Sequence, residues 1–135
     1  LNYKMKILND GEPYEEFENF LSDHMQDGRL MFEGIFCVTD GLAYIVIKML
    51  RNLGLRVPED VQVIGFDGIR YFNSQDYICS TIVQPVPEIA GMCVDLLLQE
   101  NMPVRPPLIC LPVTYGAGGT TREGEMEKKG DKLWQ

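Results

Sequence analysis

The sequence has little of what metal sites and secretion require. Its 135 residues include one histidine and four cysteines, and no two of the cysteines form a CxxC pair. A zinc site is therefore not expected, and neither a metal nor a cofactor is predicted. Each cysteine lies in an apolar run, which predicts buried, reduced thiols and favours a cytoplasmic location. These cysteines are Cys37, Cys79, Cys93 and Cys110.

Signatures of catalysis and of membrane insertion are also missing. No apolar run approaches the length of a membrane span, and neither a GxSxG motif nor a Walker-type glycine loop is present. The single histidine, His24, has no nucleophile at useful spacing. Residues 116–119 are rich in glycine but lack the third glycine of GxGxxG, and we interpret them as a flexible exit loop. We therefore expect no enzyme.

Positive charge is scarce. The chain has 12 Lys and Arg against 20 Asp and Glu, a formal net charge of −8. A surface that grips duplex DNA should be basic, so this chain alone is not expected to bind DNA. The length predicts one domain. The chain starts Leu-Asn-Tyr-Lys, which predicts a fragment or a processed chain.

Short apolar runs alternate with amphipathic runs along the chain. They predict strands at 3–8, 34–38, 61–67, 80–84 and 108–113, and helices from Pro13 to Asp27-Gly28, at 41–53 and at 87–99. This alternation predicts an α/β domain with an open parallel sheet and right-handed crossovers. The last strand contains Pro112, which cannot donate to a ladder, so we expect it at an edge or bent.

The predicted helix 41–53 has almost no polar face in its first two turns. A helix that covers a sheet needs only one apolar stripe, so the excess implies a second buried face. Another helix of the same chain could cover that face. A subunit interface is the interpretation we favour.

The stretch from Gly54 to Gly68 combines a helix end, a buried strand and a carboxylate. Gly54 and Pro58 are helix stop signals, and the strand that follows ends at Asp67. Gly65 and Gly68 flank Asp67, and we expect them to keep the backbone open around it. Ligands of open parallel sheets bind outside the carboxyl ends of the strands, where Asp67 is predicted to lie.

Three predicted loops at strand ends carry side-chain oxygens: Asn9-Asp10, Thr39-Asp40 and Asp67. In a doubly wound sheet they converge on one rim, and carboxylates there suit a hydroxylated ligand such as a sugar. Helix capping is the alternative for Asp40, which directly precedes its helix, and we favour it. For Asp67, which precedes no obvious helix, we favour ligand binding.

Several strings in order resemble the LacI/GalR family of bacterial transcriptional regulators. They are GIFCVTD at 34–40, GLRVPEDV at 54–61, QVIGFD at 62–67 and STIVQP at 80–85. The resemblance implies a three-layer α/β lobe of the periplasmic-binding-protein-like type I fold. It implies that residues 1–121 form the C-terminal lobe of an effector-binding core and that 122–135 form a solvated tail. The family's DNA-binding headpiece is not in this chain, so DNA would be bound only through that headpiece.

The resemblance also implies roles for individual residues. Effector contacts are implied for Asp67, for Asp10, for Thr39 and Asp40, and for Gln84 at the crossover between lobes. The helix at 41–53 matches a dimer-interface helix, which implies a homodimer through Leu42, Tyr44, Ile45, Lys48 and Met49. The helix within 86–100 matches one that returns to pack on the first lobe. Here we expect its apolar face to be covered by another copy or by repacking.

The implied function is sensing of a small effector, a sugar or related metabolite, by a cytoplasmic regulator. Effector identity is not implied. Two rival interpretations remain, a solute-binding protein that serves a transporter and a small α/β enzyme. The absent signal peptide and the GLRVPEDV string count against the first of these, and the missing nucleophile counts against the second.

Overall fold

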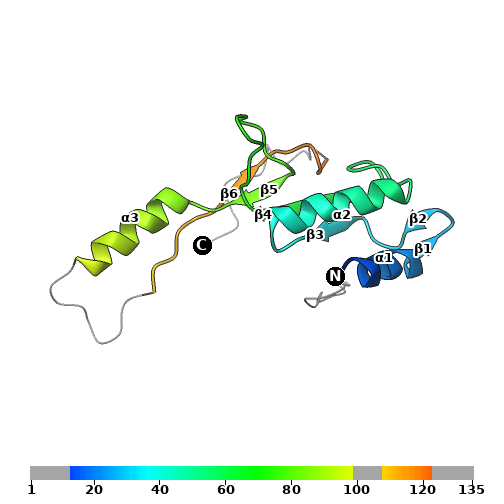
Figure 1. The fold of residues 1–135 in the computed structure, drawn as a ribbon, viewed down its shortest axis with the longest axis horizontal. Coiled ribbons are helices and arrows are strands. Elements are labelled where there is room, and N and C mark those ends of the chain that lie inside the picture. Colours follow the sequence, from blue (N-terminus) through cyan, green and yellow to red (C-terminus); the bar gives the residue numbers. More distant parts are fainter. Residues whose placement is uncertain (1–12, 99–107, 123–135) are drawn as a thin grey trace, which may run out of the picture.

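The computed structural model describes residues 13–98 and 108–122, and a four-stranded sheet in the order β3-β4-β5-β6 lies at its centre (Figure 1). β3, β4 and β5 are parallel, and β6 runs antiparallel to β5. The strands are β3 (Gly34–Phe36), β4 (Gln62–Asp67), β5 (Thr81–Val83) and β6 (Thr114–Gly116). The predicted α/β class with parallel strands is confirmed.

The last predicted strand is wrong. Residues 108–113 form no strand, and β6 begins only after Pro112, at Thr114. Pro112 cannot donate to a ladder, so pairing starts where amide donors are again available. β6 then pairs with β5 in the opposite direction, with Val83 opposite Thr114. The predicted strand at 3–8 lies outside the described residues.

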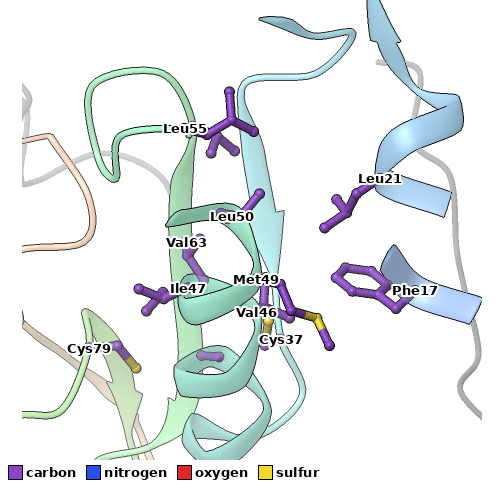
Figure 2. Close-up of a cluster of buried hydrophobic side chains, with 12 residues drawn as sticks. Phe17, Leu21, Cys37, Val46, Ile47, Met49, Leu50, Leu55, Val63 and Cys79 are labelled. Atoms are coloured by element: carbon purple, nitrogen blue, oxygen red, sulfur yellow. The ribbon is translucent and has the colours of Figure 1, made fainter. Parts of the chain in front are cut away.

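Helix α2 (Asp40–Asn52) covers one face of the sheet, as predicted. Thr39 caps its start, because the Thr39 hydroxyl accepts a hydrogen bond from the Leu42 amide at 3.2 Å. Figure 2 shows α2 side chains turned toward the strands, and each fully buried aliphatic side chain contributes about 1.5–3 kcal/mol. The core cluster comprises Phe17, Leu21, Cys37, Ala43, Val46, Ile47, Met49, Leu50, Leu55, Val61, Val63 and Cys79.

Part of the second apolar face of α2 is covered by another helix of the same chain. Met49 is 7 % exposed and points toward Phe17 of helix α1 (Pro13–Asp23) (Figure 2). A neighbouring helix thus covers Met49, which leaves this side chain little surface for the predicted dimer interface. The other four predicted interface residues stay half-buried or exposed: Leu42, Tyr44, Ile45 and Lys48.

The pair Asp27-Gly28 forms a hairpin turn and does not end the preceding helix. α1 stops at Asp23, and β1 (Met25–Gln26) pairs antiparallel with β2 (Arg29–Leu30). Asp27 and Gly28 both have positive φ, 52° and 75°, which is typical of two-residue hairpin turns. An Asp-Gly dipeptide can end a helix or form a hairpin turn, and the prediction that this one ends the helix is wrong.

Helix α3 (Val86–Leu97) forms as predicted but has no buried residue. Figure 1 shows it projecting away from the sheet. Among the described residues, the sheet face opposite α2 is also poorly covered, with Phe36 60 % and Tyr115 56 % exposed. The described part of the chain therefore presents two apolar surfaces.

Residues 118–121 are pinned to the start of β5. The Ser80 hydroxyl accepts hydrogen bonds from the amides of Gly118, Thr120 and Thr121 at 3.1–3.3 Å. A Cβ added to Gly118 would collide with the Cys79 backbone. The prediction of a flexible exit loop at 116–119 is thus wrong, because glycine here permits close packing.

Replacing Gly118 with alanine tests this close contact. Gly118→Ala should lower the free energy of unfolding by about 1–3 kcal/mol, since the new methyl group meets backbone that cannot move aside. Urea denaturation followed by circular dichroism measures the change. Gly91→Ala is the matched control, because Gly91 lies in α3 with no atom within 4 Å of the added Cβ. Equal stability of Gly118→Ala and the parent chain would contradict the packing described here.

Candidate functional site

Asp67 lies at the carboxyl end of β4, as the sequence predicts. Its Oδ1 accepts a hydrogen bond from Gln84 Nε2 at 2.8 Å, and the Asp67 side chain is half-buried. The φ of Asp67 is 126°, a region that L residues rarely occupy. Backbone strain of this kind is concentrated at functional sites. The structure therefore brings together Asp67 and Gln84, two of the predicted effector contacts.

Asp40 has a different position from the one predicted. It is the first residue of α2, Thr39 caps the helix, and the Asp40 side chain has no exposed surface. Its Oδ2 accepts from the Ile69 amide at 2.6 Å, and its Oδ1 accepts from Thr81 Oγ1 at 2.6 Å. The helix-cap interpretation of Asp40 is wrong, because its carboxylate faces the interior and bonds to residues far along the chain.

Close packing around Asp40 explains Gly65. A Cβ at this position would collide with Asp40 Oδ1 and would lie 3.0 Å from Cys79 Sγ. The backbone near Gly65 is crowded, and the expectation that this glycine keeps it open is wrong. Glycine is needed at this position so that the buried carboxylate can lie against β4.

The remaining predicted contacts are divided. Thr39 is exposed, and its hydroxyl is engaged with the Leu42 amide. Asp10 lies outside the described residues. Sequence reasoning missed Thr81, whose hydroxyl donates to Asp40 and accepts from the Gly68 amide at 3.2 Å. A threonine in a short β-branched strand looks like ordinary strand composition, so no local signal singled it out.

A second candidate surface is the outer strip of α2, which we define as Leu42, Tyr44, Ile45 and Lys48. Tyr44 is 42 % exposed, and Lys48 Nζ lies 5.4 Å from the centroid of its ring. An exposed aromatic ring beside aliphatic side chains is typical of the centre of a protein interface. The strip is therefore a candidate contact surface.

The four cysteines fall into two pairs of opposite environment. Cys37 and Cys79 are buried as predicted, whereas Cys93 and Cys110 are exposed, so the prediction is wrong for those two. Burial raises the pKa of Cys37 to about 12. Burial first, and then the neighbouring carboxylate of Asp40, raise the pKa of Cys79 to about 12. Cys79 Sγ lies 3.6 Å from Asp40 Oδ1 and donates to it.

The described residues contain no helix long and apolar enough to cross a membrane.

Comparison with protein families gives one match over nearly the whole chain. Residues 4–121 match the model described as "Periplasmic binding protein-like domain". The sucrose operon repressor of Pediococcus pentosaceus is 33 % identical over 85 residues, 63 % of this chain and 24 % of that repressor. The ribose operon repressor of Halalkalibacterium halodurans is 30 % identical over 95 residues, 69 % of this chain and 29 % of that repressor. The chain thus spans about a quarter of the length of these relatives.

Solved structures give the same fold. The lac repressor dimer bound to operator and the anti-inducer ONPF matches with a TM-score of 0.64 and 25 % identity. The match covers 80 % of this chain and 36 % of that one. An uncharacterized protein from Actinobacillus succinogenes matches with a TM-score of 0.61 and 26 % identity, over 81 % of this chain and 41 % of that one.

Thiol titration separates the two cysteine pairs. With a disulfide reagent at pH 8, Cys93 and Cys110 should react quickly, and Cys37 and Cys79 should react only as the chain unfolds, because burial and high pKa both suppress the thiolate. Cys93→Ser should remove one fast thiol, and Cys79→Ala should remove none. Four equally fast thiols in the folded chain would contradict the burial of Cys37 and Cys79.

Proposed function

We propose that this chain, which belongs to the periplasmic binding protein-like domain family in its LacI/GalR form, senses a small effector for a transcriptional regulator. In this proposal, residues 1–121 are the C-terminal lobe of the effector core and 122–135 are a solvated tail. The effector is a sugar or related metabolite. The chain binds and does not catalyse.

The carboxylate of Asp67 is the observation that carries the proposal. It lies at the carboxyl end of a central parallel strand, half-buried, beside the amide of Gln84. A carboxylate and an amide that share one hydrogen bond still offer free lone pairs and an N–H, which suits the paired hydroxyls of a sugar. The sucrose and ribose operon repressors among its relatives support this class of ligand.

In this proposal, DNA is bound only by a headpiece that is separate from this chain. The net charge of −8 opposes direct contact with phosphates. The location in this proposal is the cytoplasm, where operator DNA lies. A transporter-associated solute-binding protein is the rival function, and the repressors among the relatives favour the regulator.

Two helices supply the surfaces for protein contact in this proposal. The outer strip of α2 forms a homodimer interface, and α3, within 86–100, packs on a first lobe. A 12-residue helix with no buried residue is only marginally stable in water, so α3 needs such a partner. Lobe closure on an effector would then shift a two-state equilibrium that the headpiece senses.

Sugar titration tests the effector role. With D-ribose, sucrose and L-arabinose at millimolar concentration, amide shift changes in two-dimensional NMR should be centred on residues 67–69 and 84. The affinity should be weak, because this lobe supplies only one side of the cleft. Asp67→Ala should abolish the changes, and Asp76→Ala, in the exposed loop that follows, should leave them intact. Shift changes that survive Asp67→Ala, or micromolar binding by this chain, would count against the proposal.

Sedimentation equilibrium tests the dimer. Ile45→Arg should raise the dimer dissociation constant at least about tenfold, because it places a charge in the apolar outer strip of α2. Leu97→Arg is the matched control, since Leu97 is 81 % exposed on α3. A dimer lost on Leu97→Arg and kept on Ile45→Arg would assign the interface to α3. A parent chain that stays monomeric would refute the assignment to α2.

A further inference from the structure

The segment that follows Asp67 is tied down by a buried carboxylate from another element. Asp40 Oδ2 accepts from the Ile69 amide at 2.6 Å. Asp40 Oδ1 accepts from Thr81 Oγ1 at 2.6 Å, and Thr81 Oγ1 accepts from the Gly68 amide at 3.2 Å. The two consecutive amides after Asp67 are therefore both fixed, one directly by Asp40 and one through Thr81.

The hydrogen-bond directions in this group are consistent with each other. The Thr81 hydroxyl has one proton, which it gives to Asp40, and its lone pairs remain for the Gly68 amide. Asp40 and Thr81 are both fully buried, so water does not compete for these bonds. We call Asp40, Thr81 and the amides of Gly68 and Ile69 the Asp40 clamp.

We propose that Asp40 is a positioning residue of the effector site, an inference that rests on the effector role proposed for Asp67. The Asp40 clamp holds the backbone on the C-terminal side of Asp67, and the β4 ladder holds it on the other side. Asp67 keeps its φ of 126° between these two fixed points, and its carboxylate stays within reach of Gln84. Asp40 itself touches no ligand.

The position of Asp40 also joins two functional parts of the lobe. Asp40 is the first residue of α2, the helix that carries the outer strip. Its carboxylate accepts a hydrogen bond from the segment that follows Asp67. A displacement of this segment by ligand must therefore stretch a bond to the first turn of α2 or move that turn. The clamp thus joins the first residue of α2 to the two residues that follow Asp67.

Amide hydrogen exchange on the full 135-residue chain tests the clamp. Asp40→Ala should lower the protection of the Ile69 amide about tenfold or more relative to that of Val63, a buried residue of β4 whose amide donates to the Thr120 carbonyl. Thr81→Val should do the same to Gly68, and Thr81→Ser, which keeps the hydroxyl, should restore it. The Gln84 side-chain amide resonance should move in Asp40→Ala and in Thr81→Val.

Val46→Ala is the matched control, because Val46 is a buried core residue of α2 outside the clamp. It should lower all protection in parallel and leave the Gln84 resonance in place. If Asp40→Ala does not fold, the comparison of Thr81→Val with Thr81→Ser tests the clamp, since both variants retain Asp40.

Two results would overturn the proposal. One is loss of Ile69 and Gly68 protection only in parallel with Val63, which assigns Asp40 to general stability. The other is a Gln84 resonance that does not respond to the clamp variants. The sugar titration is separate. An intact exchange pattern in a chain that shows no sugar response supports the clamp and counts against the effector role of Asp67.

Discussion

The packing of α2 against the sheet depends on the burial of one carboxylate. Asp40 has no exposed surface, and a buried carboxylate is costly unless donors surround it. Helix α2 helps, because the partial positive charge of its N-terminus lies at Asp40. The donors come from three further places, the Ile69 amide, the Thr81 hydroxyl and the Cys79 thiol. β4, in turn, makes room with Gly65. These elements must therefore assemble together, and the same bonds fix the segment after Asp67.

The features of this arrangement that depend on neighbouring residues in the sequence could be predicted. The position of Asp67 followed from a β-branched run with glycines around its end, and α2 followed from its apolar residues and stop signals. The role of Asp40 did not follow, because an aspartate at a helix start looks the same whether it caps the helix or is buried. Its partners Ile69 and Thr81 lie 29 and 41 residues away, where no local pattern reaches.

The same reason explains why the structure of residues 116–119 was not predicted. Their glycines resemble a flexible loop in the sequence, but the Ser80 hydroxyl, 38 residues from Gly118, accepts from the Gly118 amide. The prediction of the last strand was wrong in both its direction and its position. Alternation of strands with helices cannot reveal an antiparallel strand such as β6.

The uncovered apolar surfaces fit the idea of a lobe that works within a larger assembly. Among the described residues, α3 has no buried residue, Phe36 and Tyr115 are exposed on one sheet face, and Tyr44 is exposed in the outer strip of α2. Exposed apolar side chains that lie together can mark interaction surfaces. The formal net charge of −8 does not favour contact with nucleic acid phosphates. A sensing lobe that pairs with a second copy on one side and a first lobe on another would cover these surfaces.

The antiparallel pairing of β5 and β6 has a consequence for the length of the chain between them. Val83 and Thr114 lie side by side, so the chain leaves the lobe toward α3 and re-enters it at neighbouring points. α3 follows β5 directly along the chain, and β6 is the next described strand after it. The β5–β6 ladder therefore fixes these two points of the fold beside each other. The number of residues between the two strands can vary at little cost, since doubling a loop adds only about 0.6 kcal/mol of closure entropy.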